Sequence, residues 1–166
     1  MPSLLNALLL SVFAVGFTAS SGAIAADTSQ STEFQVTNID AAMKRFTKLP
    51  HPMASAEQRK LAQDIKSGLS KHGWQVQSQK FKTKIPNLAH HQLGGKDKKA
   101  APIKEVEGEN IIAISKGSER CMLLIGGHYD TKFYKDFSFV GANDGGSSTA
   151  AMQELARVIQ GIRVQE

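Results

Sequence analysis

Two short segments carry the side chains best suited to chemistry, with His128 and Asp130 in the first and Asp144 in the second. The first reads Gly-Gly-His-Tyr-Asp and follows an apolar run, and the second reads Gly-Ala-Asn-Asp-Gly-Gly and precedes a helical pattern. Imidazole and carboxylate are both zinc ligands. Because strand ends and the loops that follow them meet at the carboxyl edge of an open α/β sheet, we expect these side chains to share one site.

The position of each residue indicates what it can do. His128 follows two glycines, which let backbone and ligand approach closely, and its imidazole can bind zinc if the other ring nitrogen is held. Asp130 points to the same side in an extended chain and can hold that nitrogen. Asp144 directly precedes a helix, where a carboxylate either caps the first turn or bridges two metal ions.

Other catalytic classes are not indicated. The sequence contains no Walker A run, no His-Glu-x-x-His and no Gly-x-Ser-x-Gly. Cys121 is the only cysteine, which excludes an internal disulfide. It opens an apolar run, so we expect it to be a buried small hydrophobic residue rather than a nucleophile.

The N-terminus predicts export. Residues 1–26 form a secretory signal pattern, with an apolar stretch from Leu4 to Phe17 and an Ala-x-Ala cleavage site. The apolar stretch is too short for a stable membrane span, so a secreted or periplasmic location is expected. Residues 27–37 are expected to be a flexible leader and residues 38–166 a folded domain.

The formal net charge of +5 does not indicate nucleic-acid binding. Much of the excess lies between Lys80 and Lys104, where the single aromatic residue Phe81 does not make the interleaved series that stacks on bases. The polar stretch Thr83–Gly108 is therefore interpreted as a solvated loop.

Hydrophobic periodicity and turn signals predict alternating helices and strands. The expected elements are a helix capped by Asn38 and ended by Pro50, a helix capped by Ser55 and ended at Gly73, strands at 74–77, 110–114 and 122–125, a helix at 145–160 ended by Gly161, and a strand starting at Ile162.

This order predicts α/β layering with helices on a mixed sheet. The first strands are expected to pair antiparallel, because short turns join them. The unbroken apolar run Met122–Ile125 is typical of a strand covered on both faces, and the helix after it implies a parallel partner.

The stretch from Leu123 to Ile159 resembles the zinc aminopeptidase family M28, and within that superfamily it is similar to glutaminyl cyclases. The shared pattern is Gly-x-His-x-Asp, then Gly-Ala-x-Asp before a helix that contains Glu-Leu-Ala-Arg. The resemblance implies a three-layer helix–mixed sheet–helix fold of the zinc-exopeptidase type. Residues 38–166 would be its N-terminal portion, and thus a truncated form of it.

The resemblance also implies metal-binding roles. In the two-zinc peptidases the residue matching His128 binds one metal, the residue matching Asp144 bridges both, and the residue matching Asp130 supports the histidine. In the one-zinc cyclases the match to Asp144 is a ligand and the match to His128 is not. The general-base Glu belongs to a Glu-Glu pair that is expected beyond Glu166, so no catalytic base is assigned in this chain. Glu154 is expected to make surface ion pairs within its helix.

These implications predict a secreted, zinc-dependent aminopeptidase that acts at peptide or protein N-termini, here as an incomplete and inactive chain. A glutaminyl-peptide cyclotransferase and a non-catalytic relic of the same fold are the alternatives. One or two zinc ions, the preferred substrate side chain and the oligomeric state stay open.

Overall fold

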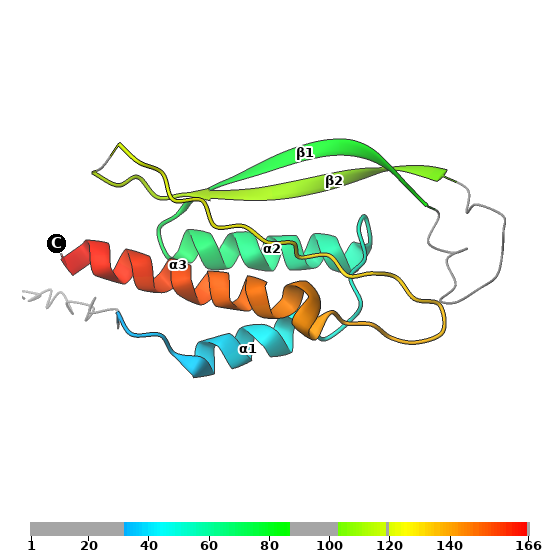
Figure 1. The fold of residues 1–166 in the computed structure, drawn as a ribbon, viewed down its shortest axis with the longest axis horizontal. Helices are drawn as coiled ribbons and strands as arrows, with labels where there is room; N and C mark the ends of the chain where they lie inside the picture. The colour runs from blue at the N-terminus through cyan, green and yellow to red at the C-terminus, as the bar shows by residue number, and fades with distance from the viewer. Residues whose placement is uncertain (1–31, 87–102, 119, 166) are drawn as a thin grey trace, which may run out of the picture.

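The computed structural model describes residues 32–86, 103–118 and 120–165, coloured along the chain in Figure 1. The predicted signal sequence and most of the predicted leader lie outside these residues. The elements are α1 (Val36–Phe46), α2 (Ala56–Lys71), β1 (Gln75–Pro86), β2 (Ile103–Ile114), the single π-helical turn η2 (Ala142–Gly146) and α3 (Ser147–Gln165). No helix among these residues is long and apolar enough to cross a membrane.

Helix α1 begins at Val36, with Gln35 at the N-cap position, three residues before the predicted cap at Asn38. The prediction that Asn38 caps it is wrong, because Asn38 lies inside the first turn and its amide donates to Glu154 Oε2 at 3.0 Å. Glu154 also accepts the backbone N–H of Gln35 at 2.7 Å. A carboxylate from α3 therefore satisfies the start of α1, which a local cap does in most helices.

Helix α2 follows its sequence signals closely. Ser55 Oγ accepts the backbone N–H of Gln58 at 3.0 Å, which confirms the predicted cap. Gly73 follows the end of the helix with φ 81°, which confirms its role as the left-handed residue after the C-cap.

Strands β1 and β2 form an antiparallel pair, with Gln75 opposite Ile114 and Pro86 opposite Ile103. The predicted antiparallel pairing is confirmed, but both strands extend well into the stretch interpreted as a loop. The reason is that its charges alternate across the strands. Lys82 and Lys84 face Glu107 and Glu105 in register, and such opposite-charge pairs stabilise a sheet. Residues 87–102, between the strands, lie outside the described residues.

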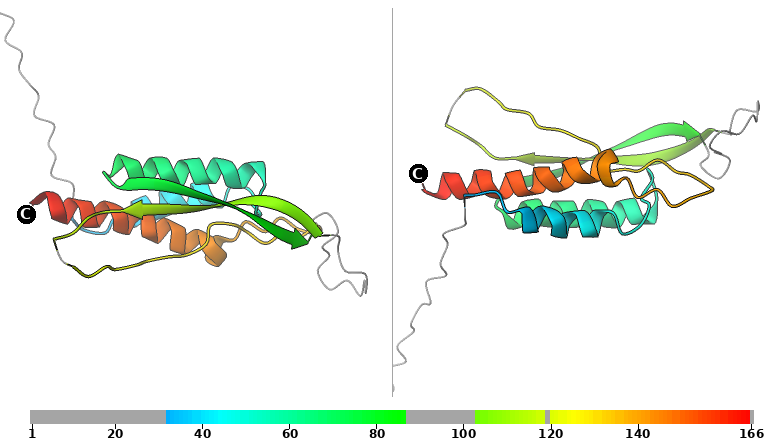
Figure 2. Two further views of the ribbon diagram at one scale, coloured as in Figure 1. Left: turned by 90° about the horizontal axis from the view of Figure 1, so that it is seen from above. Right: turned by 60° about the horizontal axis from the view of Figure 1, so that its bottom comes forward.

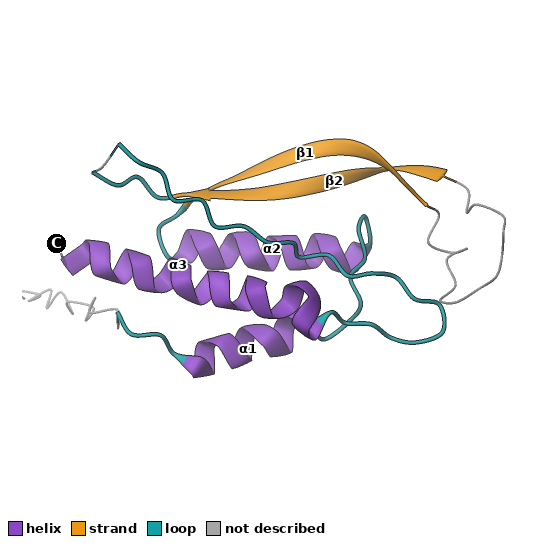
Figure 3. Ribbon diagram, viewed as in Figure 1, coloured by secondary structure: helices purple, strands orange, loops and turns teal. Residues whose placement is uncertain are grey.

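The helices pack beside one face of the strand pair and against each other (Figure 3). The buried cluster between them consists of Ala42, Phe46, Leu61, Ile65 and Ala150. Partly buried residues, among them Ile111 of β2 and Tyr129, pack against this cluster. The core therefore joins all three helices to the sheet and to the segment that holds His128. The predicted α/β packing of helices on a sheet is confirmed.

The predicted strand Met122–Ile125 is not formed. This segment runs as an extended loop, seen clear of the helices in Figure 2. The exposed fractions of Met122, Leu123 and Leu124 are 88%, 82% and 86%. A strand needs a hydrogen-bonded neighbour, and the described residues place no strand partner along this run. Cys121 is exposed for the same reason, so its predicted burial is wrong.

The predictions for the end of the chain are also wrong. Helix α3 continues to Gln165, through Gly161 and through Ile162, where a strand was expected. Gly161 is buried and is not among the glycines with positive φ. A glycine within a helix costs only about 1 kcal/mol relative to alanine, so it does not end a helix unless the chain reverses there.

Candidate metal centre

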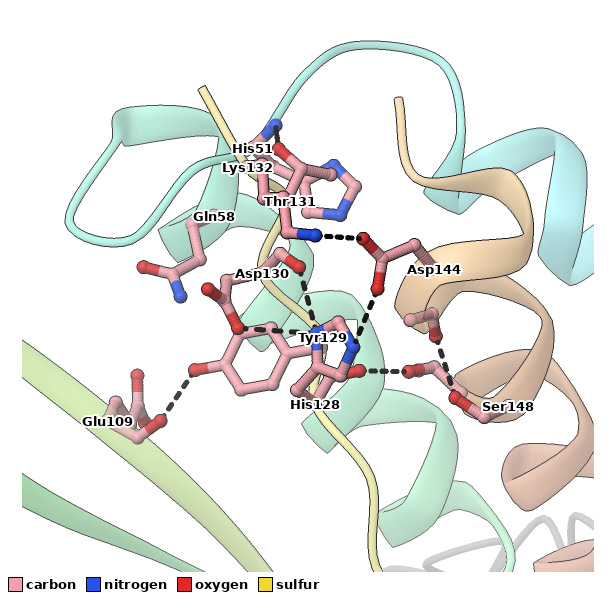
Figure 4. Close-up of polar contacts among 12 residues, drawn as sticks. His51, Gln58, Glu109, His128, Tyr129, Asp130, Thr131, Lys132, Asp144 and Ser148 are labelled. Atoms are coloured by element: carbon pink, nitrogen blue, oxygen red, sulfur yellow. Dashed lines mark hydrogen bonds and ion pairs between the residues drawn. The ribbon is translucent and has the colours of Figure 1, made fainter. Parts of the chain in front are cut away.

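The segment from His128 to Lys132 lies across the protein with alternate side chains on opposite sides. Tyr129 donates its hydroxyl to the carbonyl of Glu109 in β2 at 2.8 Å. Thr131 is buried; its N–H donates to the carbonyl of His51 at 3.2 Å, and its Oγ1 accepts the N–H of His51 at 3.0 Å. With these side chains anchored to the scaffold, the side chains of His128 and Lys132 lie toward Asp144, and that of Asp130 lies beside His128 (Figure 4).

The backbone at His128 is held close to the start of α3. Thr149 Oγ1 donates to the carbonyl of His128 at 3.2 Å. A Cβ on Gly127 would lie 3.0 Å from Cε of Met152, and one on Gly145 would lie 2.9 Å from Cε1 of His128. Of the two glycines predicted to permit close approach, Gly127 does so, whereas a Cβ on Gly126 would meet nothing within 4 Å. Gly145, which was not predicted to have this role, permits the close approach of the His128 ring.

Asp144 is carried by a turn that requires glycine. Gly141 and Gly145 have φ of 63° and 94°, in the region that favours glycine. The N–H of Gly146 closes the turn by donating to the carbonyl of Gly141 at 3.0 Å. Asp144 itself has φ −100° and ψ 86°, which are not helical values. Its carboxylate faces His128 and Lys132 rather than the first turn of α3, so capping does not explain this residue.

The structure brings together the three residues that the sequence singles out. His128 Nε2 lies 3.2 Å from Asp144 Oδ1, and His128 Nδ1 lies 3.5 Å from Asp130 Oδ1. The backbone carbonyl of Asp130 is closer to Nδ1, at 3.1 Å. Because a carbonyl only accepts, this contact places a proton on Nδ1 and directs Nε2 toward Asp144.

The spacing of the two donors fits a metal ion. Two ligands at zinc bond lengths of about 2.0–2.2 Å and tetrahedral angles are about 3.4 Å apart, and Nε2 and Oδ1 are 3.2 Å apart. The side chains of His128 and Asp144 are 53% and 39% exposed, so an ion can reach them from solvent. Among residues 32–86, 103–118 and 120–165, no group of three or more His, Cys, Asp or Glu side chains is close enough to hold a metal. Two donors are therefore in place for a site that needs more.

Two residues near Asp144 and His128 were not predicted from the sequence. Lys132 Nζ lies 3.7 Å from Asp144 Oδ2. In an extended segment every second side chain lies on the same side, so the spacing of Lys132 from His128 and Asp130 could have predicted its position. His51 is buried, and its Nδ1 contacts the carbonyl of Leu49 at 2.8 Å. Its pairing with Thr131 depends on a contact between segments 80 residues apart, for which the sequence holds no local signal.

The contacts between Tyr129 and β2 are accompanied by shifted pKa values of Glu109 and Tyr129. Lys66 and Ser78 both donate to the Glu109 carboxylate, and these hydrogen bonds lower its pKa. Burial raises the pKa of Tyr129 to about 12, helped by the negative charges of Glu109 and Asp130. Tyr129 therefore stays protonated and can keep donating to the Glu109 carbonyl through the neutral pH range.

The sequence of this region is similar to one known family. Residues 110–165 match the family model Peptidase family M28, and the match covers this part of the chain only. The matched residues contain His128, Asp130 and Asp144, and the resemblance indicated by the sequence is confirmed. No curated protein matches the chain.

Solved structures share the fold. A glutaminyl cyclase from Fimbriiglobus ruber aligns with a TM-score of 0.60 at 20% identity, over 77% of this chain and 41% of that one. An aminopeptidase from Aneurinibacillus sp. strain AM-1 aligns with a TM-score of 0.60 at 15% identity, over 81% of this chain and 61% of that one. The predicted zinc-exopeptidase type of fold is therefore confirmed. The chain described here spans about two fifths and three fifths of the lengths of these two proteins.

Proposed function

We propose that this chain forms part of a zinc-dependent M28 enzyme of the aminopeptidase type, which acts at peptide N-termini. His128 and Asp144 would be zinc ligands. The observation that carries this proposal is the 3.2 Å separation of His128 Nε2 and Asp144 Oδ1 on an accessible surface. The signal pattern of residues 1–26 supports export of this enzyme.

The chain's own residues position the ligands. The carbonyl of Asp130 accepts from Nδ1 of His128, which leaves Nε2 as the metal-binding nitrogen. The turn from Gly141 to Gly146 presents Asp144 in a non-helical conformation, so its carboxylate is not used by α3. Zinc in such a place supplies a Lewis acid that polarises a substrate carbonyl and acidifies bound water.

A second candidate is cyclisation of an N-terminal glutamine, in which the amine of the residue attacks its own side-chain amide. One observation favours it: Lys132 lies at the second oxygen of Asp144, at 3.7 Å. That leaves one carboxylate oxygen for metal, and polarising a single amide carbonyl requires only one ion.

Metal binding tests the proposal directly on this chain. Zinc and cobalt titrations followed by calorimetry and by cobalt absorption should show weak binding, because two protein donors do not complete a four-coordinate site. His128→Ala and Asp144→Asn should each abolish it. Binding that survives both substitutions would show that the ions bind elsewhere and would sink the assignment.

Activity separates the candidates. The chain, and any longer product of its gene, should be assayed on aminoacyl and on N-terminal glutaminyl peptides. Release of the first residue supports the aminopeptidase, and loss of ammonia with ring closure supports the cyclase. A longer product that retains full activity with Asp144→Asn would contradict both proposals.

A further inference from the structure

The residues directly after α2 attach the end of this helix to α3. His72 is the C-cap residue of α2. Trp74, two residues on, donates its indole N–H to the carbonyl of Ala156 in α3 at 3.0 Å (Figure 1). Between them, a Cβ on Gly73 would lie 3.7 Å from Nε2 of Gln160, one turn further along α3. We call this contact the α2–α3 junction.

His72 brings an imidazole into the junction with one ring nitrogen buried. Its Nδ1 is buried and has no hydrogen-bond partner among the residues that the structure describes. A neutral imidazole carries its proton on one nitrogen only, so it can place that proton on Nε2 and leave Nδ1 as a lone pair. An imidazolium carries a proton on both nitrogens, and its Nδ1 would be a buried donor without an acceptor. The closed junction therefore accommodates the neutral form of His72.

The charged groups around His72 mostly act in the same direction. Burial lowers the pKa of His72 below its ordinary value of 6.5, and the positive charges of Lys71 in α2 and Arg157 in α3 lower it further. Glu154 of α3 acts in the opposite direction, but its Oε1 already accepts from Arg157 Nη2 at 2.6 Å. His72 therefore binds a proton more readily when the junction is open than when it is closed.

We propose that the α2–α3 junction is an acid-sensitive contact, which opens in mildly acidic solution because opening lets His72 take up a proton. This inference does not depend on the metal-ligand candidates. Because the pKa of His72 is lowered in the folded chain, its contribution to stability is complete above pH 6.5 and is lost as the pH falls below that value. Glu109 and Glu154, whose pKa values are lowered from 4.5, lose their contributions only below about that pH. Mild acid therefore separates His72 from these carboxylates.

The junction carries its own reporter, since Trp74 is the only tryptophan of the chain. Hydrogen exchange of its indole N–H, followed by NMR and corrected for the intrinsic pH dependence of exchange, measures how often the bond to Ala156 opens. An unpaired buried donor typically costs the equivalent of about a 5- to 150-fold change in an equilibrium constant. From pH 7 to pH 5 we expect opening in the full chain to increase about fivefold or more.

The matched variants are His72→Gln and His128→Gln. His72→Gln cannot take up the proton, so its opening should stay constant between pH 7 and pH 5. His128→Gln removes a histidine whose side chain is 53% exposed and should behave like the unmodified chain. The ring of His72 in the unmodified chain gives a measurement that needs no variant: NMR should show the Nε2–H tautomer and a titration midpoint below 6.5.

Three results would overturn the inference. They are a His72 midpoint at or above 6.5, equal protection of the Trp74 indole at pH 7 and pH 5, and the same acid response in His72→Gln as in the unmodified chain. If His72→Gln does not fold, the ring titration and the protection of the unmodified chain decide the question. Each of these results leaves the proposed function standing, because zinc binding by His128 and Asp144 is measured at neutral pH.

Discussion

Between His128 and Lys132, successive residues serve two purposes. Tyr129 and Thr131 attach the segment to β2 and to His51, while His128 and Lys132 face Asp144 and Asp130 lies beside His128. Alternation places side chains of one parity on one face of an extended chain. The contacts of Tyr129 and Thr131 therefore determine how precisely the side chains on the opposite face, among them His128 and Lys132, are positioned.

Asp130 acts on His128 through two groups, and a substitution can separate them. Asp130→Asn removes the carboxylate charge but keeps the backbone carbonyl, which is the closer group to Nδ1 at 3.1 Å against 3.5 Å. Loss of groups that orient a metal ligand typically costs 10–100-fold, so we expect about tenfold weaker zinc binding, at the lower end of that range. Calorimetry measures it, with Asp136→Asn as the control for an exposed acid on the same loop. A loss above 100-fold would show that the carboxylate, not the carbonyl, holds the ring.

Tyr129 predicts how the fold responds to alkaline pH. Its pKa is raised by burial from 10.0 to about 12 in the folded chain. Between these values the unfolded chain loses the phenolic proton and the folded chain keeps it, so the contribution of Tyr129 to stability is complete below pH 10 and is lost as the pH rises to 12. The sequence has two tyrosines, so Tyr134→Phe leaves Tyr129 as the single one. Its tyrosinate absorbance should appear near pH 12; a midpoint near 10 would contradict its burial.

Helix α3 is tied to the start of α1 by a buried ion pair, where the sequence predicted surface pairing. Arg157 donates to Glu154 and to the carbonyl of Glu33, each at 2.6 Å. Burial opposes ionisation of Glu154, but hydrogen bonds from Arg157, Gln35 and Asn38 together outweigh it and lower its pKa. The predicted spacing of the pair at i and i+3 is correct, and the predicted exposure is wrong, because Glu154 also caps α1.

Removing one partner of this pair should destabilise the fold strongly. Arg157→Met leaves the Glu154 carboxylate buried without its cation, and such a change typically costs about 3–5 kcal/mol. Urea unfolding followed by circular dichroism measures the loss. Lys44→Met, which breaks the exposed pair with Asp40, should cost less than about 1 kcal/mol. Equal effects of the two substitutions would mean that the buried pair does not join α1 to α3.

The surface of the chain as a whole carries an unusual apolar segment. Met122, Leu123 and Leu124 are each more than 80% exposed and follow one another directly. Continuous exposed apolar surface in extended backbone favours association with other chains.

We expect residues 27–166 to self-associate through this run. Leu124→Lys should lower light scattering in concentrated solution and leave the helical signal unchanged, because the side chain has few packing contacts to lose. Val36→Lys is the matched control, since Val36 is 77% exposed but lies in α1, away from the run. Equal scattering of Leu124→Lys and the unmodified chain would place the association elsewhere.

Interactions between residues close together in the sequence allowed part of this structure to be predicted. The Ser55 cap, the Gly73 stop and the pairing of β1 with β2 depend on residues close together in the sequence or on a simple alternation. The meeting of His128 with Asp144 was also predicted, although the strand before His128 on which that prediction relied is not formed.

Tertiary structure decided the rest. The cap of α1 comes from Glu154, 119 residues from Gln35, and no pattern near either residue encodes it. Lys132 meets Asp144 because Thr131 pairs with His51. The apolar run Met122–Ile125 reads as a buried strand, yet a strand forms only beside a hydrogen-bonding neighbour, and the described residues supply none. Composition and periodicity specify what a segment can form, but the partners that lie beside it determine what it does form.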